Sequence, residues 1–313
     1  MNRFCVGKER AFGVVIAVAL ALVTGVTGGR AYGSYVFTTL DDPVAYAATT
    51  AAYGISGTTV VGYYNDAVGD HGFSYNGSGY AAINDPLAIA GQTFAYGISG
   101  GTVVGQYWDG SRFHGFSYNG STYTALTVPS AGTFGTMARG MSGSTIVGYY
   151  YDGSYGVHGF SYNGSSYSAL NDPSATSGTY AEGISGGTIV GYFQDAKGAH
   201  GFEYNGGSYT TLDDPLATDG TYAYGMSGGV IVGSYYDAIG GHGFSFDGTS
   251  YKTIDDPLAG VQDTFVQGIS GSTLVGYYDD IAGVHGFIAT VPEPGSLAIL
   301  AIGSVGLLRR RRR

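Results

Sequence analysis

The apolar residues of this chain occur in short runs that alternate with polar residues and are separated by glycine-rich turns. One representative stretch contains four such runs, at 222–227, 230–236, 242–246 and 250–254. The runs are rich in tyrosine, valine, isoleucine and phenylalanine, which favour strands, and Gly-Gly or Asp-Gly pairs join some of them. No helix-like period is present outside the two ends of the chain. The pattern therefore predicts an antiparallel meander of four strands.

This meander occurs six times along the chain. The motif Gly-(Ile/Met)-Ser-Gly begins at residues 54, 97, 140, 183, 225 and 268, and His-Gly-Phe begins at residues 71, 114, 158, 200, 242 and 285. Both motifs return every 42 to 44 residues. Four strands in a repeat of this length are typical of one blade of a β-propeller.

The phase of the repeats indicates how the two ends of the fold meet. The last repeat lacks a fourth strand, and an unassigned strand-like run at 35–40 precedes the first repeat. Pairing the two would remove open sheet edges, which invite aggregation. We therefore predict an all-β fold, a six-bladed β-propeller of four-stranded antiparallel blades whose ring is closed by the N-terminal strand. An open solenoid or stacked hairpins are the alternatives. The repeats fall at about 44–86, 87–129, 130–173, 174–215, 216–257 and 258–290 plus the strand 35–40, within a domain at 32–290.

The N-terminal segment, residues 1–31, has the pattern of a signal peptide. Basic residues precede an apolar run from residue 11 to about residue 26, and small residues around Ala31 form a plausible cleavage site for signal peptidase. A membrane anchor is the alternative, but the run is short and broken by glycine. Short apolar helices are expected at both chain ends. The only cysteine, Cys5, lies in this segment, so the exported domain is predicted to contain no disulfide.

The C-terminal segment, residues 291–313, has three parts in a fixed order. Pro292, Glu293 and Pro294 come first, then an apolar stretch at 297–308, then five arginines that begin with Arg309. This order resembles the PEP-CTERM sorting signal of exported bacterial proteins. The resemblance implies an exosortase-type transpeptidase that cleaves near the Pro-Glu-Pro triplet.

The physical properties of this C-terminal segment agree with that resemblance. The apolar stretch is too short to cross a bilayer fully, and the arginines would stay on the cytoplasmic side. Transient membrane contact is therefore expected. An ordinary tail anchor is the alternative.

The repeat also resembles the HAF family of extracellular repeats. Gly54-Ile55-Ser56, Val60-Val61-Gly62-Tyr63 and His71-Gly72-Phe73 match the three parts of that family's unit in order. Glycine replaces the family's alanine between histidine and phenylalanine in all six copies. The resemblance implies export and repetition but no known chemistry.

The charge of the chain is divided unevenly between the ends and the middle. The whole chain has a formal net charge of −10, but between residues 32 and 290 four basic residues stand against 21 acidic ones, a net charge of −17. Phosphate binding needs basic patches, so nucleic acid is an improbable partner. A polysaccharide or a cationic surface is more compatible with this charge.

Aspartates recur at the ends of the second and fourth strands of each repeat. In an antiparallel blade these two loops share one face, so 18 of the 19 aspartates are predicted to lie on one acidic face. The side chains fit turns in which aspartate accepts hydrogen bonds from the backbone. The alternative is a Ca²⁺ site, because Ca²⁺ prefers oxygen ligands. The candidates for its ligands are Asp213, Asp214, Asp255 and Asp256.

All six histidines occur once per repeat, at the start of the third strand. Spread around a ring, they are too far apart to bind zinc together. We expect each to contact a neighbouring loop, either a carbonyl group or the repeated aspartate.

Two places break the repeat. The residue before the repeated glycine is tyrosine in three copies, but it is Arg139 and Glu182 in two neighbouring copies, which predicts an ion pair between blades. In the second repeat, Trp108 and Arg112 enter a loop of the acidic face, which makes them a candidate ligand patch.

These features predict an exported, non-catalytic repeat protein that is sorted to the surface or extracellular matrix of a bacterium. There it would be structural, adhesive or associated with polysaccharide. No catalytic residues or cofactor are assigned. The alternative is a secreted carbohydrate-active enzyme, since a glycosidase needs only two suitably spaced carboxylates on the acidic face.

Overall fold

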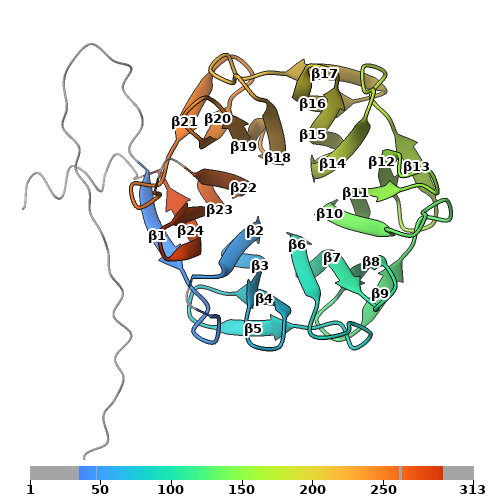
Figure 1. Ribbon diagram of the computed structural model, residues 1–313, viewed down its shortest axis with the longest axis vertical. Coiled ribbons are helices and arrows are strands. Elements are labelled where there is room, and N and C mark those ends of the chain that lie inside the picture. Colours follow the sequence, from blue (N-terminus) through green and yellow to red (C-terminus); the bar gives the residue numbers. More distant parts are fainter. Residues whose placement is uncertain (1–34, 47, 261–262, 292–313) are drawn as a thin grey trace, which may run out of the picture.

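The computed structural model describes residues 35–46, 48–260 and 263–291 of the chain. These residues form 24 strands and no helix. The strands follow one another in antiparallel meanders that surround a central axis in a propeller-like arrangement (Figure 1). The all-β prediction is thus confirmed. The first strand of each meander lies nearest the axis (Figure 1).

The strands have the following bounds. The first two meanders are β2 (Thr50–Ser56), β3 (Thr59–Asn65), β4 (Asp70–Tyr75), β5 (Tyr80–Ile83), and β6 (Thr93–Ser99), β7 (Thr102–Trp108), β8 (Phe113–Tyr118), β9 (Tyr123–Leu126). The next two are β10 (Thr136–Ser142), β11 (Thr145–Tyr151), β12 (Val157–Tyr162), β13 (Tyr167–Leu170), and β14 (Gly178–Ser185), β15 (Thr188–Asp195), β16 (Gly198–Asn205), β17 (Ser208–Leu212). The last two are β18 (Thr221–Ser227), β19 (Val230–Tyr236), β20 (Gly241–Phe246), β21 (Tyr251–Ile254), and β22 (Thr264–Ser270), β23 (Thr273–Asp280), β24 (Gly283–Thr290) with β1 (Val36–Leu40).

Hydrogen bonding divides these strands differently from the prediction of six separate blades. Four sheets have four strands each, and a fifth sheet has eight, because the meanders β10–β13 and β14–β17 are joined. The joint is a single parallel bridge between Val157 of β12 and Gly178 of β14. The predicted count is therefore corrected to four separate four-stranded blades and one double-sized sheet. The ladders of paired strands do not continue from sheet to sheet into one ring, although isolated bridges such as Thr49 with Val284 link neighbouring sheets.

The N-terminal strand lies on the outer edge of the last sheet, which has the order β1-β24-β23-β22. β1 is antiparallel to β24, with Val36 opposite Thr290 and Leu40 opposite Gly286. Strands from opposite ends of the described chain therefore share one sheet. The apolar helices predicted at both chain ends, and the processing positions Ala31, Pro292, Glu293, Pro294 and Arg309, lie outside the described residues.

Each meander is centred on one phenylalanine, the last residue of His-Gly-Phe. All six of these side chains are completely buried, and each stabilises the fold by about 1.5–3 kcal/mol through burial. Space for the ring comes from the glycine in the second strand. A Cβ atom on Gly62 would lie 2.9 Å from the ring of Phe73. The buried phenylalanines are Phe73, Phe116, Phe160, Phe202, Phe244 and Phe287.

The motif Gly-(Ile/Met)-Ser-Gly packs neighbouring meanders together around the axis. A Cβ atom on Gly54 would lie 2.6 Å from the carbonyl oxygen of Tyr96 in the next meander, so only glycine permits this approach. The same close approach links the last meander to the first: a Cβ atom on Gly268 would lie 2.7 Å from the carbonyl oxygen of Tyr53. The backbone N–H of Gly57 also donates to Ser270 Oγ at 3.2 Å. The first and last meanders are therefore in direct contact.

Candidate functional site

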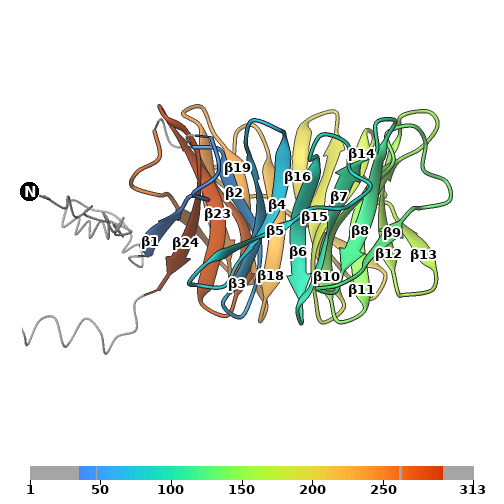
Figure 2. The ribbon, with the colours of Figure 1, turned by 90° about the horizontal axis from the view of Figure 1, so that it is seen from below.

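The loops of the propeller gather on two opposite faces (Figure 2). Because the strands are antiparallel, the loops after the second and fourth strands of each meander share one face, which we call the acidic face. The tight turns after the first and third strands lie on the other, the turn face. The two kinds of acidic-face loop touch: the N–H of Tyr46 donates to the carbonyl of Asn65 at 2.9 Å. Only Asp247, among the aspartates, lies in a turn-face connection.

Aspartates at the end of each second strand organise their own loops. Asp66 Oδ1 accepts a hydrogen bond from the N–H of Val68 at 2.7 Å. This hydrogen bond is the main reason that the pKa of Asp66 is lowered, and His71 contributes to the same effect. The pKa is lowered in the same direction at the equivalent residues of the other five meanders. These residues are Asp109, Asp152, Asp195, Asp237 and Asp280.

Five of the six histidines connect the two kinds of acidic-face loop, whereas His114, with Thr127 at the equivalent position of the following loop, contacts Asp109 in the preceding loop. The imidazole of His242 stacks on Tyr235, with ring centroids 5.0 Å apart. Its Nδ1 lies 3.1 Å from Asp255 Oδ1 in the following loop, and its Nε2 lies 3.4 Å from Asp237 Oδ1 in the preceding loop. In three meanders the residue beside Nδ1 is an aspartate, and in two it is an asparagine. These residues are Asp41, Asp213 and Asp255, and Asn84 and Asn171.

The four aspartates predicted as calcium ligands are distributed between two separate loops. Asp213 and Asp255 contact histidines, whereas Asp214 and Asp256 are buried and accept backbone hydrogen bonds in turns. Among the residues that the structure describes, no group of three or more His, Cys, Asp or Glu side chains is arranged to hold a metal ion. The structure therefore does not bring these carboxylates together.

The predicted ligand patch lies in the loop between β7 and β8. Arg112 lines a shallow depression together with Asp109, Ser111 and two residues of the third meander, Gly132 and Thr133. Trp108 ends β7, and its ring packs edge-on against Phe113 with centroids 5.0 Å apart. The two candidates are therefore close in the loop, but the indole packs on a neighbouring ring.

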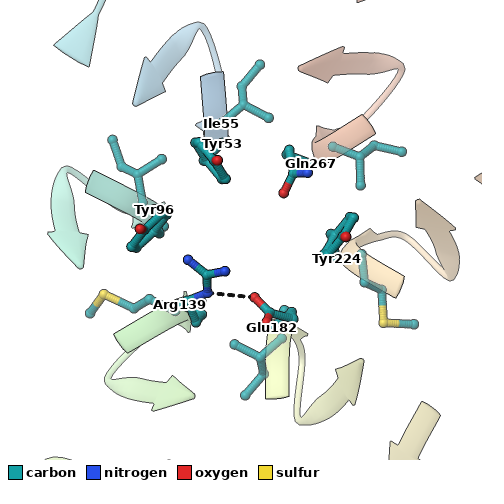
Figure 3. Close-up of a pocket in the computed structure, with 18 residues that line it drawn as sticks. Tyr53, Ile55, Tyr96, Arg139, Glu182, Tyr224 and Gln267 are labelled. Atoms are coloured by element: carbon teal, nitrogen blue, oxygen red, sulfur yellow. Dashed lines mark hydrogen bonds and ion pairs between the residues drawn. The ribbon is translucent and has the colours of Figure 1, made fainter. Parts of the chain in front are cut away.

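Arg139 and Glu182 form an ion pair across neighbouring meanders. Arg139 Nε donates to Glu182 Oε2 at 2.8 Å, and the guanidinium lies 4.1 Å from the ring centroid of Tyr96 (Figure 3). Glu182 and the surrounding tyrosines raise the pKa of Arg139 although burial opposes its charge. Burial raises the pKa of Glu182, and Arg139 opposes that shift.

The ion pair belongs to a ring of six side chains around the axis. In every first strand the residue before the repeated glycine is a β-bulge, which redirects its side chain toward the axis. The six residues line a cavity of about 80 Å³, which we call the axial pocket (Figure 3). They are Tyr53, Tyr96, Arg139, Glu182, Tyr224 and Gln267.

One feature of the acidic face was not predicted from the sequence. This face carries most of the exposed apolar side chains. Of the twelve large apolar residues that are exposed among the described residues, eleven lie in acidic-face loops. A signal was present in the sequence, because an apolar residue follows Asp-Pro in several repeats. The eleven are Val44, Tyr46, Val68, Leu87, Ile89, Phe134, Tyr155, Leu216, Ile239, Leu258 and Ile281.

The fold defines an all-β, propeller-like protein, and comparisons with known proteins agree. A family model for the PEP-CTERM protein-sorting motif matches residues 290–313. No curated protein matches the chain. Across its described residues the chain contains no helix that is long and apolar enough to span a membrane.

Solved structures show the same kind of fold. A mutant of the Aleuria aurantia lectin in complex with alpha-methyl-L-fucoside is 15% identical, with a TM-score of 0.54 over 79% of this chain and 93% of the lectin. The β-propeller domain of the Trilobed protease from Pyrococcus furiosus, described as having an open velcro topology, is 10% identical. Its TM-score is 0.50 over 79% of this chain and 97% of that domain. At these identities the similarity concerns the fold alone.

Proposed function

We propose that this protein is a non-catalytic component of the bacterial cell surface or extracellular matrix, which it reaches through its C-terminal sorting signal. The observation that carries the proposal is the sorting motif at residues 290–313, which indicates an exported protein processed by an exosortase. The proposal adds that the chain passes through the membrane only transiently.

The position at which the sorting motif begins determines which face of the propeller would point away from the attachment point. β24 runs from Gly283 on the acidic face to Thr290 on the turn face, and β1 starts on the turn face at Val36. Both ends of the described domain therefore leave from the turn face, at the outer edge of the last sheet (Figure 2). A protein attached through its C-terminal segment would then direct its acidic face away from the attachment point.

The acidic face is the surface that we propose for adhesion. It combines carboxylates with exposed apolar side chains, and such apolar patches commonly mark interaction sites. A polysaccharide or a cationic surface would meet both kinds of group there. Most of the aspartate side chains are occupied by their own turns and by histidines, which supports a structural role over a catalytic one.

Localisation tests the first part of this proposal. The full chain and a variant lacking residues 292–313 would be expressed in a host that has an exosortase, and the cell surface, membrane and medium would be fractionated. We expect the full chain at the surface and the shortened chain in the medium or periplasm. An identical distribution of both chains would refute sorting by this segment.

Binding tests the second part. The exported domain, extended to residue 291 so that it contains the control position, would be screened against matrix polysaccharides in parallel assays of binding and hydrolysis. Replacing the exposed Ile239 and Ile281 by serine should weaken binding, whereas the control Val291→Ser, away from the acidic face, should not. Release of reducing ends in the hydrolysis assay would favour the enzyme alternative.

A further inference from the structure

The axial pocket lies on the propeller axis and is lined by both polar and apolar side chains. The first strand of each meander runs from the acidic face to the turn face, so the pocket lies at the turn-face end of the axis, opposite the proposed adhesive surface. Its remaining lining comes from the repeated Gly-(Ile/Met) pairs. The apolar members are Ile55, Ile98, Met141, Ile184, Met226 and Ile269.

One carboxylate oxygen in this pocket has no partner. Glu182 Oε2 accepts the hydrogen bond from Arg139, but Glu182 Oε1 is buried and without a hydrogen-bond partner among the described residues. The Glu182 side chain is only 6% exposed, so water in the bulk does not solvate that oxygen. A buried acceptor left unsatisfied costs about 1–3 kcal/mol, and more when it is charged. A molecule in the pocket that donates a hydrogen bond would remove this cost.

The surrounding groups restrict the chemistry of such a molecule. The terminal nitrogens of Arg139 point toward the axis and can donate, while the unpaired oxygen of Glu182 can only accept while ionised (Figure 3). A hydroxyl group can form hydrogen bonds with both Arg139 and Glu182, since it can donate and accept. Because the pair has no net charge, it offers a charged molecule no net attraction to offset the cost of leaving water, which disfavours both anions and cations. The tyrosine rings beside the pair offer apolar faces for carbon–hydrogen groups.

Stability alone does not account for the pair. The bulge has the same register shift in all six meanders, and three of the six positions hold tyrosine without difficulty. A buried ion pair is often replaceable by apolar residues at no loss of stability, owing to the cost of desolvating both charges. The backbone geometry therefore does not by itself explain charges at two adjacent positions of the ring.

We propose that the axial pocket, with its volume of about 80 Å³, binds a compact, uncharged polyhydroxylated group, either a small polyol or the edge of the terminal residue of a sugar chain. Two neighbouring hydroxyl groups would bond to Arg139 and Glu182, and the carbon face would lie against a tyrosine ring. Because the pocket and the acidic face lie at opposite ends of the axis, this site is independent of the adhesive surface.

Calorimetry and ligand-observed NMR test this site on the domain at 32–290. The probes are glycerol, sorbitol and the methyl glycosides of glucose, galactose, mannose and fucose, with acetate and methylammonium as charged comparisons. We expect at least one neutral probe to bind and both charged probes to fail. Glu182→Gln should weaken that binding by about tenfold or more, as expected for a hydrogen bond to a charged group. The matched control Glu203→Gln, on β16, should leave it unchanged.

A second variant covers the case in which Glu182→Gln unfolds the protein. Met141→Trp would fill the pocket from its apolar lining while leaving both residues of the ion pair in place, and it should abolish binding of the same probe. The proposal is overturned if no neutral probe binds the wild-type domain, so that only water occupies the pocket. It is also overturned if a probe binds with equal affinity to the wild type and to Met141→Trp.

Discussion

Asp256 gives the most direct test of how the acidic face is built. Its Oδ1 accepts a hydrogen bond from the N–H of Leu258 at 2.9 Å, while its Oδ2 is buried and has no partner among the described residues. The residue is 4% exposed. Burial raises the pKa of Asp256 from 3.8 to about 6, although the hydrogen bond from Leu258 and the nearby His285 both oppose the shift.

The size and sign of the effect follow from this shift. One pKa unit corresponds to about 1.4 kcal/mol. A carboxyl group whose pKa rises from 3.8 to about 6 on folding therefore changes the free energy of unfolding by about 3 kcal/mol between its two protonation states. Because the folded-state pKa is the higher one, this stability is fully present below pH 3.8 and is lost as the pH rises through about 6. Asp256 thus favours the folded state only while it is protonated.

The variant Asp256→Asn isolates this contribution. Asparagine keeps the acceptor for Leu258 but cannot ionise. As the pH rises from acidic values to 7.5, the free energy of unfolding of the variant should therefore increase by up to about 3 kcal/mol relative to that of the wild type. Urea unfolding at several pH values measures the difference. The control Asp247→Asn lies on the turn face, where backbone and side-chain hydrogen bonds lower the pKa of Asp247, so its trend with pH should be opposite. Parallel pH profiles for wild type and Asp256→Asn would refute the reasoning.

Three further predictions concern the packing of the fold. Gly140→Ala should cost about 1–3 kcal/mol in urea unfolding, because the added Cβ would lie 2.7 Å from the carbonyl oxygen of Glu182, whereas Gly153→Ala points into open space and should be neutral. Phe160→Ala should cost about 3–5 kcal/mol in the same assay, whereas the exposed Phe134→Ala should have little effect. Deleting 35–40 should expose the edge of β24 and produce oligomers in light scattering; a monodisperse shortened domain would contradict this role of β1.

The strand positions were predictable because each leaves a local signal. The run predicted at 230–236 coincides with β19, Val230–Tyr236, and the run at 222–227 differs from β18 by one residue. Turn glycines mark these boundaries through their backbone conformation: Gly228 and Gly229 between the two strands have φ values of 58° and 83°. Local composition therefore sufficed for the elements and their order.

Other features depend on contacts that no local pattern encodes. The bridge between Val157 and Gly178 merges two meanders through one residue pair, and a repeat count cannot reveal it. The bulge in each first strand is likewise hidden. The polar and apolar residues of that strand alternate along the sequence with no visible interruption at the bulged residue. The pairing of Arg139 with Glu182 was predicted from their equivalent positions in adjacent repeats, but the unpaired oxygen of Glu182 depends on the depth of its burial.

The six repeats provide an internal comparison that separates residues required by the fold from residues that are free to differ. The glycine against the neighbouring carbonyl, the buried phenylalanine and the histidine beside the aspartate that ends the second strand occur in all six meanders, since the geometry of each meander requires them. The bulge position has equivalent backbone geometry six times yet holds four residue types. The backbone therefore does not dictate that choice. Arg139 and Glu182, which carry the desolvation cost of two charges, are accordingly the residues for which we infer a functional reason in addition to folding.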